Sequence, residues 1–318
     1  MVLVLATLFR LPVLVNAGAV NSDAAVVGLQ ARHILHGELG WHLWGTDYQG
    51  ALDSLLAALS FAIFGARPLA LFAVPFVGLL VMVSLAFDVL RRHIKPWAAA
   101  LSVMPLVFAP MASNSPMVYV MRQTLATSLV LGVWLVESAP RCARPPLRLA
   151  MAGAVFALGL YIDLFAIVAL PAAALFLLSS RDASGTGTSF DPRAIAPATL
   201  RRVGLGLLGA GIGLALLGLL AGVVPLGRIA HNARLLMDTC LPFALGTKIF
   251  IKGEALVAQP WSAPAPVLGL QLLGATGFAL SVLSAGPLAF SKRVPWPARR
   301  LGLLGLLTTL AKIGRAHV

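Results

Sequence analysis

Charged residues are scarce in this sequence. Only 11% of its 318 residues are Asp, Glu, Lys or Arg, while 59% are hydrophobic. Soluble domains carry about 25% charged residues and about 45–50% apolar ones. A globule of this size would therefore lack the polar side chains that a surface in water needs. The deficit excludes a soluble enzyme and a disordered chain, and it indicates that lipid surrounds most of the protein.

Acidic residues and cysteine are also rare. There are 11 Asp and Glu against 24 Lys and Arg, which gives a net charge of +13. A soluble protein with this excess would be a candidate for binding nucleic acid. In a membrane protein, Lys and Arg instead collect in cytoplasmic loops, so we expect membrane lipids as partners and no nucleic acid. The two cysteines, Cys142 and Cys240, fall on opposite predicted sides and predict no disulfide.

Long apolar runs predict an all-α polytopic membrane protein, because about 20 apolar residues cross the hydrocarbon core. About nine transmembrane helices are expected, with the last one truncated. The expected spans are 2–19, 68–90, 97–112, 117–137, 149–162, 164–179, 203–223, 263–290 and 301–311. Arg10 and Pro12 interrupt the first span, which we interpret as a retained anchor helix rather than a signal peptide.

Segment 51–65 is apolar but too short for its length to show whether it crosses. If it lies on the membrane surface and the N-terminus is cytoplasmic, the inner loops hold more than twice as many Lys and Arg as the outer loops. If it crossed, this bias would invert. The positive-inside rule therefore predicts an interfacial or re-entrant helix there.

These spans predict a single transmembrane domain over residues 1–311. It has a first outer loop at 20–67 and a second long outer loop at 224–262, and we find no soluble domain and no clear internal repeat. Residues 312–318 (KIGRAHV) end an apolar run that has barely begun to span. One reading frame of a common sequencing adapter encodes the same seven residues, so we expect a non-native tail after truncation. A short basic tail is the alternative.

The first outer loop carries the densest polar sequence, beginning with Asn21, Ser22 and Asp23. Asn21 or Ser22 is suited to cap a short helix, which places Asp23 in its first turn at the membrane surface. Two roles fit Asp23: a functional acid, or a carboxylate that only favours the helix N-terminus.

Further along the loop lies WHLWGTDYQG, residues 41–50. Its aromatic residues are typical of interface anchors, and they also suit the stacking of a sugar ring, with Asp and Gln taking the hydroxyls. His33, His36 and His42 raise the question of a metal. No Cys or second paired carboxylate stands at ligand spacing, so we assign no metal ligands.

The runs NSDAAVVGLQARHILHGE and YQGALDSLLAALSFAIFGARPLALFAVPFVGLL carry a family resemblance. Over residues 8–180 the chain resembles GT-C-type glycosyltransferases, and more closely the bacterial family-39-like and RgtA/B/C/D-like transferases. These are related to protein mannosyltransferases and to lipid A aminoarabinose transferases. One departure is that many relatives have Asp-Glu where this chain has Asp23-Ala24.

The resemblance implies inverting transfer of a sugar from a polyprenyl-phosphate donor to a lipid or polysaccharide acceptor. The reaction would take place on the extracytoplasmic face of a bacterial inner membrane. Asp23 matches the position of the acid that opens the first outer loop, which makes it the expected general base. No cofactor is assigned, although some relatives use a divalent cation. Substrate-binding residues are expected at Arg32, Asp47, Tyr48, Gln49, Arg122 and Asp163.

Alternatives remain for several of these residues and for the function. Arg122 is near the outer end of a span, where its side chain can bind the leaving phosphate or reach for lipid headgroups. Asp163 is either a sugar ligand or a solvated turn acid. Asp88 and Glu137, near Arg91, Arg92 and Arg141, are expected in ion pairs. A transporter or lipid flippase is the main functional rival, and a non-catalytic membrane scaffold is the second.

Overall fold

The computed structural model describes residues 1–15, 17–18, 20, 22–46, 48–108, 120–164, 166 and 196–220, together with Arg234 and Met237. These residues form helices, with only isolated β-bridges beside them, which confirms the predicted all-α fold class. The expected spans 263–290 and 301–311, nearly all of 164–179 and of loop 224–262, and the tail 312–318 lie outside the described residues.

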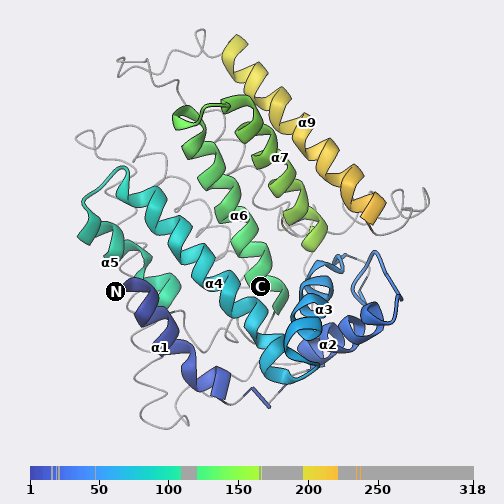
Figure 1. The fold of residues 1–318 in the computed structure, drawn as a ribbon. Helices are drawn as coiled ribbons and strands as arrows, with labels where there is room; N and C mark the ends of the chain where they lie inside the picture. The colour runs from blue at the N-terminus through green and yellow to red at the C-terminus, as the bar shows by residue number, and fades with distance from the viewer. Residues whose placement is uncertain are drawn as a thin grey trace.

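The helices form a row with a small helical layer at one end (Figure 1). Along the row, α5, α4, α6, α7 and α9 follow one another, while α1 lies against α4 and α5. α4 and α7 are long and apolar enough to cross a membrane. The bounds are α1 Val2–Val15, α2 Ser22–Leu35, α3 Leu52–Phe64, α4 Pro68–Arg91, α5 Pro96–Val107, α6 Val120–Ser138, the 3-10 turn η2 Ala139–Arg141, α7 Pro145–Ile162 and α9 Ala196–Leu220.

Proline sets the start of three helices. α4, α5 and α7 begin at Pro68, Pro96 and Pro145. The first helical position tolerates proline because its missing N–H would have no partner within the helix, and its fixed φ suits the first turn. α4 and α7 therefore begin within about five residues of the predicted spans, whose boundaries hydropathy alone had placed at 68 and 149.

One core joins both ends of the first loop. Leu14 and Ala17, at the end of α1, pack with α2 and α3, and so does Phe72 near the start of α4. Ser60 of α3 donates a hydrogen bond to the carbonyl of Ala70 at 2.6 Å. The end of α1 and the start of α4 therefore lie at the same end of the bundle, and α3 does not cross it. This arrangement agrees with the predicted surface helix at residues 51–65, whose position relative to a membrane stays a prediction.

We call this end of the bundle the head end; it comprises α2, the loop 36–51 and α3. A second core lies between α1, α4, α5 and α6, around Ala6, Leu79 and Val107. Arg10, on α1, is only 1% exposed, so α1 is not a simple lipid-facing helix, as its sequence predicted. Its guanidinium packs near the ring of Phe9, 5.0 Å from the centroid.

α7 and α9 approach each other backbone to backbone. A Cβ added to Gly153 would lie 1.8 Å from the carbonyl oxygen of Gly206, and one added to Gly209 would lie 1.8 Å from that of Ala150. Small residues at such positions allow close helix packing in membranes, where dispersion contacts rather than water drive association. Glycine at 153 and 209 therefore fixes the last described helix against the bundle.

Candidate active site

A single tyrosine closes the loop that precedes α3. The Tyr161 hydroxyl, at the end of α7, donates a hydrogen bond to the Trp41 carbonyl at 2.8 Å and accepts one from the Ala51 amide at 3.1 Å. The Trp41 and Tyr161 rings lie 4.7 Å apart between centroids. A Cβ on Gly50 would come within 2.5 Å of the Tyr161 carbonyl oxygen, so only glycine fits. Residues 41–51 thus form a loop clamped at both ends.

Three residues predicted to bind sugar meet beside this clamp. Gln49 forms an antiparallel bridge with Asp163, and the Leu164 amide donates to the Tyr48 carbonyl at 3.0 Å. Tyr48, Gln49 and Asp163 are all half-buried. The structure therefore brings Tyr48 and Gln49 of the first loop together with Asp163, more than 110 residues later in the sequence. The main chain of Asp163 takes part in this bridge, and its carboxylate stays a predicted sugar ligand or turn acid.

Gln30 of α2 holds the other side of the same loop. Its side chain is fully buried, and its amide nitrogen donates to the His42 carbonyl at 2.9 Å. Its amide oxygen accepts from the Trp44 amide at 3.3 Å and from the Ser54 hydroxyl at 3.0 Å. One side chain thus joins α2, the clamped loop and α3, because an amide both donates and accepts.

Asp53 is a buried acid that the sequence analysis did not select. It stands in the first turn of α3, with no exposed surface, and one carboxylate oxygen accepts a hydrogen bond from the Thr124 hydroxyl of α6. Its other oxygen, Oδ2, is buried and has no hydrogen-bond partner among the described residues. Burial raises the pKa of Asp53 to about 6, although the bond from Thr124 acts in the opposite direction.

An acid inside an apolar run was the available signal for Asp53. Residues 51–65 contain one charged residue among mostly aliphatic ones, and such a group near lipid is a functional candidate by default. A buried carboxylate with a raised pKa is suited to accept or donate a proton near neutral pH.

Asp23 and Arg32 lie on the outside of the head end. Asp23 is in the first turn of α2 as predicted, and its side chain is exposed, as is that of Arg32. Nine residues of helix separate them by about 13 Å and by half a turn, so α2 does not bring them together. Asp47 and the side chain of Arg122 are outside the described residues.

Two histidines of the first loop, His33 and His42, have separate partners. His33 Nδ1 lies 2.8 Å from Glu38 Oε2, and the His33 ring packs edge-on to that of Trp44. His42 Nδ1 lies 3.3 Å from the Gln49 carbonyl. Within the described part of the chain, no three His, Cys, Asp or Glu side chains are grouped closely enough to hold a metal ion.

Residues 51–189 match the model of the dolichyl-phosphate-mannose-protein mannosyltransferase family. No curated protein matches the chain. Among solved structures, the chain is similar to ArnT from Cupriavidus metallidurans bound to undecaprenyl phosphate, with 14% identity and a TM-score of 0.50. It is also matched to ArnT from the same organism in the apo state, with 12% identity and a TM-score of 0.47.

Both comparisons cover 94% of this chain and 56% of ArnT, so the chain spans a little over half the length of the structures it matches. The matched family region begins inside the clamped loop and includes α3, Asp53 and Asp163. The chain shares the fold of ArnT, and the resemblance predicted from its sequence is confirmed.

Proposed function

We propose that the chain transfers a sugar from a polyprenyl-phosphate donor to a lipid or polysaccharide acceptor on the extracytoplasmic face of the membrane. The observation that carries this proposal is the meeting of α2, the clamped loop 41–51, α3 and the end of α7 at one end of the bundle. That end presents carboxylates and amides where a lipid-tethered substrate would meet them. The family match over residues 51–189 supports the same activity.

The reaction is an inverting displacement in one step. The acceptor hydroxyl oxygen forms a bond to the anomeric carbon as the bond from that carbon to the donor phosphate oxygen breaks, and the phosphate leaves with the electron pair. The hydroxyl proton passes to a carboxylate acting as general base. Asp23 is the proposed base, because its exposed side chain in the first turn of α2 is accessible to an acceptor.

The remaining predicted residues have supporting roles in this proposal. Arg32 and Arg122 would bind the phosphate through charged hydrogen bonds. Asp47, Tyr48, Gln49 and Asp163 would bind sugar hydroxyls, and the bridge between Gln49 and Asp163 supports a joint role for those two. ArnT from Cupriavidus metallidurans was crystallised with undecaprenyl phosphate, which supports a polyprenyl phosphate as the lipid part of the donor.

A transporter or lipid flippase is the second candidate, and Arg10 is the observation that favours it. An arginine buried within a span is costly and commonly lines a substrate pathway. A transporter moves its substrate unchanged, so it would release the donor with the bond from phosphate to sugar intact. The two candidates therefore differ in whether labelled sugar appears in a new glycolipid.

The test is sugar transfer in membranes that contain the gene product, with Asp23→Asn compared with Glu38→Gln. Glu38 is an exposed carboxylate of the same loop, which makes it a matched control. We expect Asp23→Asn to lower the transfer rate by about 10²–10⁴-fold, the usual contribution of a general base, and Glu38→Gln to retain it. Equal rates in Asp23→Asn and wild type, at equal protein levels, would refute the assignment of the base.

A further inference from the structure

The end of the bundle opposite the head end carries a basic pocket. It has a volume of about 620 Å³ and lies where α4 ends and α5 begins. Charged and aromatic side chains dominate its lining, which includes Arg91, Arg92, His93, Lys95 and Trp97. The site proposed for sugar transfer contains none of these residues.

A second, apolar groove adjoins this pocket. It has a volume of about 450 Å³ between α1, α4 and α5, and its walls include Val2, Val83, Phe87 and Ala100. Arg91 lines both the groove and the basic pocket. A ligand that fills both spaces must have an apolar chain and a negatively charged head.

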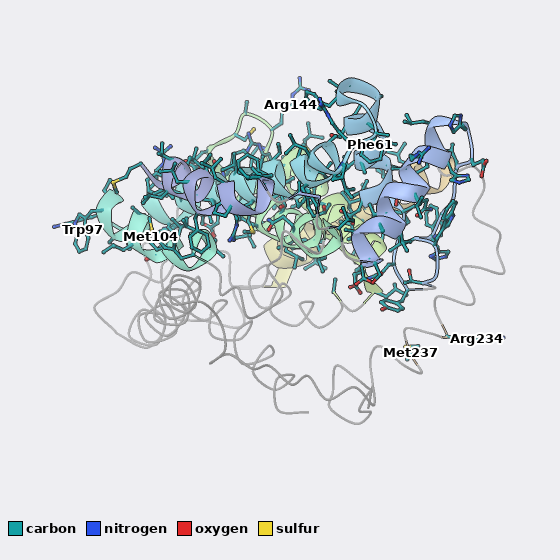
Figure 2. The ribbon with its side chains drawn as sticks, turned by 90° about the horizontal axis from the view of Figure 1, so that it is seen from below. Phe61, Trp97, Met104, Arg144, Arg234 and Met237 are labelled. Atoms are coloured by element: carbon teal, nitrogen blue, oxygen red, sulfur yellow. The ribbon has the colours of Figure 1, made fainter. Side chains whose placement is uncertain are left out.

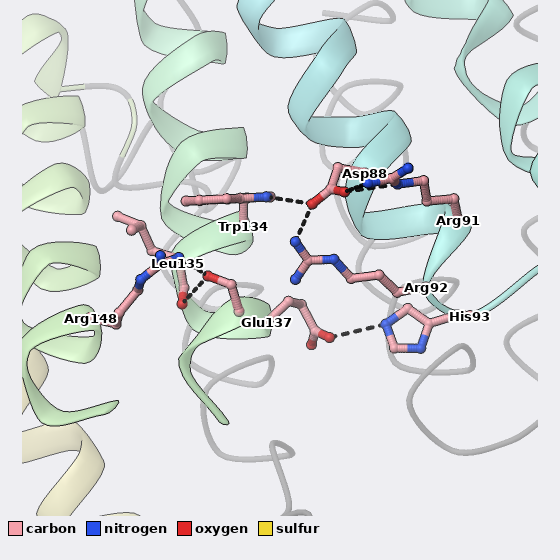
Figure 3. Close-up of polar contacts among 9 residues, drawn as sticks. Asp88, Arg91, Arg92, His93, Trp134, Leu135, Glu137 and Arg148 are labelled. Atoms are coloured by element: carbon pink, nitrogen blue, oxygen red, sulfur yellow. Dashed lines mark hydrogen bonds and ion pairs between the residues drawn. The ribbon is translucent and has the colours of Figure 1, made fainter. Parts of the chain in front are cut away.

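Ion pairs on the pocket wall leave an excess of positive charge. Asp88 pairs with Arg91 at 2.7 Å and with Arg92, and it accepts a hydrogen bond from the Trp134 indole nitrogen at 2.8 Å (Figure 3). The Arg91 side chain remains 55% exposed despite this pairing, while that of Arg92 is 18% exposed. Arg91 is thus held in place with donors still facing outward, and the exposed Lys95 adds a further positive charge.

A second acid, Glu137, lies near the pocket and contacts His93. His93 Nε2 lies 3.0 Å from Glu137 Oε2, and both side chains are mostly buried (Figure 3). Trp97 is 65% exposed and projects from the edge of the molecule (Figure 2). A Trp beside Lys and Arg at the end of a membrane helix is typical of the headgroup level of a bilayer.

We propose that these two spaces form one binding site for an anionic phospholipid. An acyl chain occupies the apolar groove, and the phosphate accepts hydrogen bonds from Arg91 and Lys95. The complementarity of charge selects an anionic lipid over a zwitterionic one, because the amine of a zwitterionic headgroup would face the same cations. Asp88, which also bonds Arg92 and Trp134, positions Arg91.

Native mass spectrometry of the purified chain with added lipid tests the site. Phosphatidylglycerol and phosphatidylcholine with identical acyl chains are compared on wild type, on Arg91→Gln/Lys95→Gln and on Arg141→Gln/Arg144→Gln. The second pair removes two exposed cations outside the pocket. We expect tighter retention of phosphatidylglycerol by wild type and a loss of about fivefold in affinity for each pocket cation removed. The Arg141→Gln/Arg144→Gln variant should bind as wild type does.

Three results would overturn the proposal. These are equal retention of both lipids, equal losses in the two double variants, and displacement of phosphatidylglycerol by millimolar inorganic phosphate, which would indicate a site for free phosphate. A separate test fills the groove without changing charge. Ala100→Phe should weaken phosphatidylglycerol binding at least tenfold, whereas Leu101→Phe, at an exposed neighbouring position, should not. Unchanged binding of phosphatidylglycerol by Ala100→Phe would show that the acyl chain does not occupy the groove.

Discussion

Replacing Asp53 with Asn should change how stability depends on pH. In the folded protein, burial raises the pKa of this carboxyl from 3.8 to about 6. Between these values the folded state keeps a proton that the unfolded state has lost, so stability falls as pH rises from about 4 to about 6 and stays low above that range. A difference of about two pKa units corresponds to about 3 kcal/mol in the free energy of unfolding.

Asparagine resembles the protonated acid, because it offers one oxygen to Thr124 and places a donor where Oδ2 stands without a partner. The Asp53→Asn variant should therefore match wild type near pH 4 and exceed it by about 3 kcal/mol at pH 7.5. The assay is thermal or chemical unfolding in detergent, followed by tryptophan fluorescence, from pH 4 to pH 8. The difference between variant and wild type isolates Asp53 from all other groups that titrate.

Two further variants sharpen this experiment. Thr124→Val removes the hydrogen bond that lowers the Asp53 pKa, so the loss of stability should move to a higher pH. Asp23→Asn changes an exposed acid to its amide and should leave the pH profile as it is in wild type. The reasoning is refuted if the difference between Asp53→Asn and wild type is the same at pH 4 and pH 7.5.

Three other predictions concern packing. Gly50→Ala should destabilise the protein by about 1–3 kcal/mol, because the new Cβ would meet the Tyr161 carbonyl. Gly18→Ala has open space around it and should not. Equal melting temperatures of these two variants would contradict the clamp. Gln30→Leu should lower the free energy of unfolding by about 2–4 kcal/mol, because the partners of three hydrogen bonds are left unsatisfied. Limited proteolysis between residues 36 and 50 should become faster. Unchanged cleavage would show that Gln30 does not hold the loop. Gly209→Ala should lower the melting temperature while Gly211→Ala raises it, because only the first meets the α7 backbone; a rise in both would mean that α9 does not pack there.

The fold followed from the sequence where one physical rule dominated. The scarcity of charge predicted a helical membrane protein, and the bias of Lys and Arg predicted a surface helix at residues 51–65, where α3 lies at the head end. α4 and α7 match the apolar runs at 68–90 and 149–162. The pairing of Asp88 with Arg91 and Arg92 was also expected, because the three residues lie one helical turn apart.

The site was harder to predict because its contacts join distant parts of the chain. The bridge between Gln49 and Asp163 and the bonds of Tyr161 depend on how α7 packs against the first loop, which no local pattern encodes. Glu137 was expected near Arg141 but pairs with His93, since helix packing brings the ends of α4 and α6 together. Asp53 could not be predicted as a site residue, because its raised pKa results from complete burial, and burial depends on how α3 and α6 pack.

The hydrogen bonds of Tyr161 hold the main chain of the first loop, whereas the side chains of the loop are not part of those bonds. The phenol bonds only main-chain atoms, because it donates to the Trp41 carbonyl and accepts from the Ala51 amide. These two bonds therefore do not depend on the side chains between residues 41 and 51. Exposed positions of this loop, such as Trp44, can therefore carry other side chains without loss of these two bonds. Under the proposed function, exchanging such side chains would change which sugar the loop binds while this support is kept.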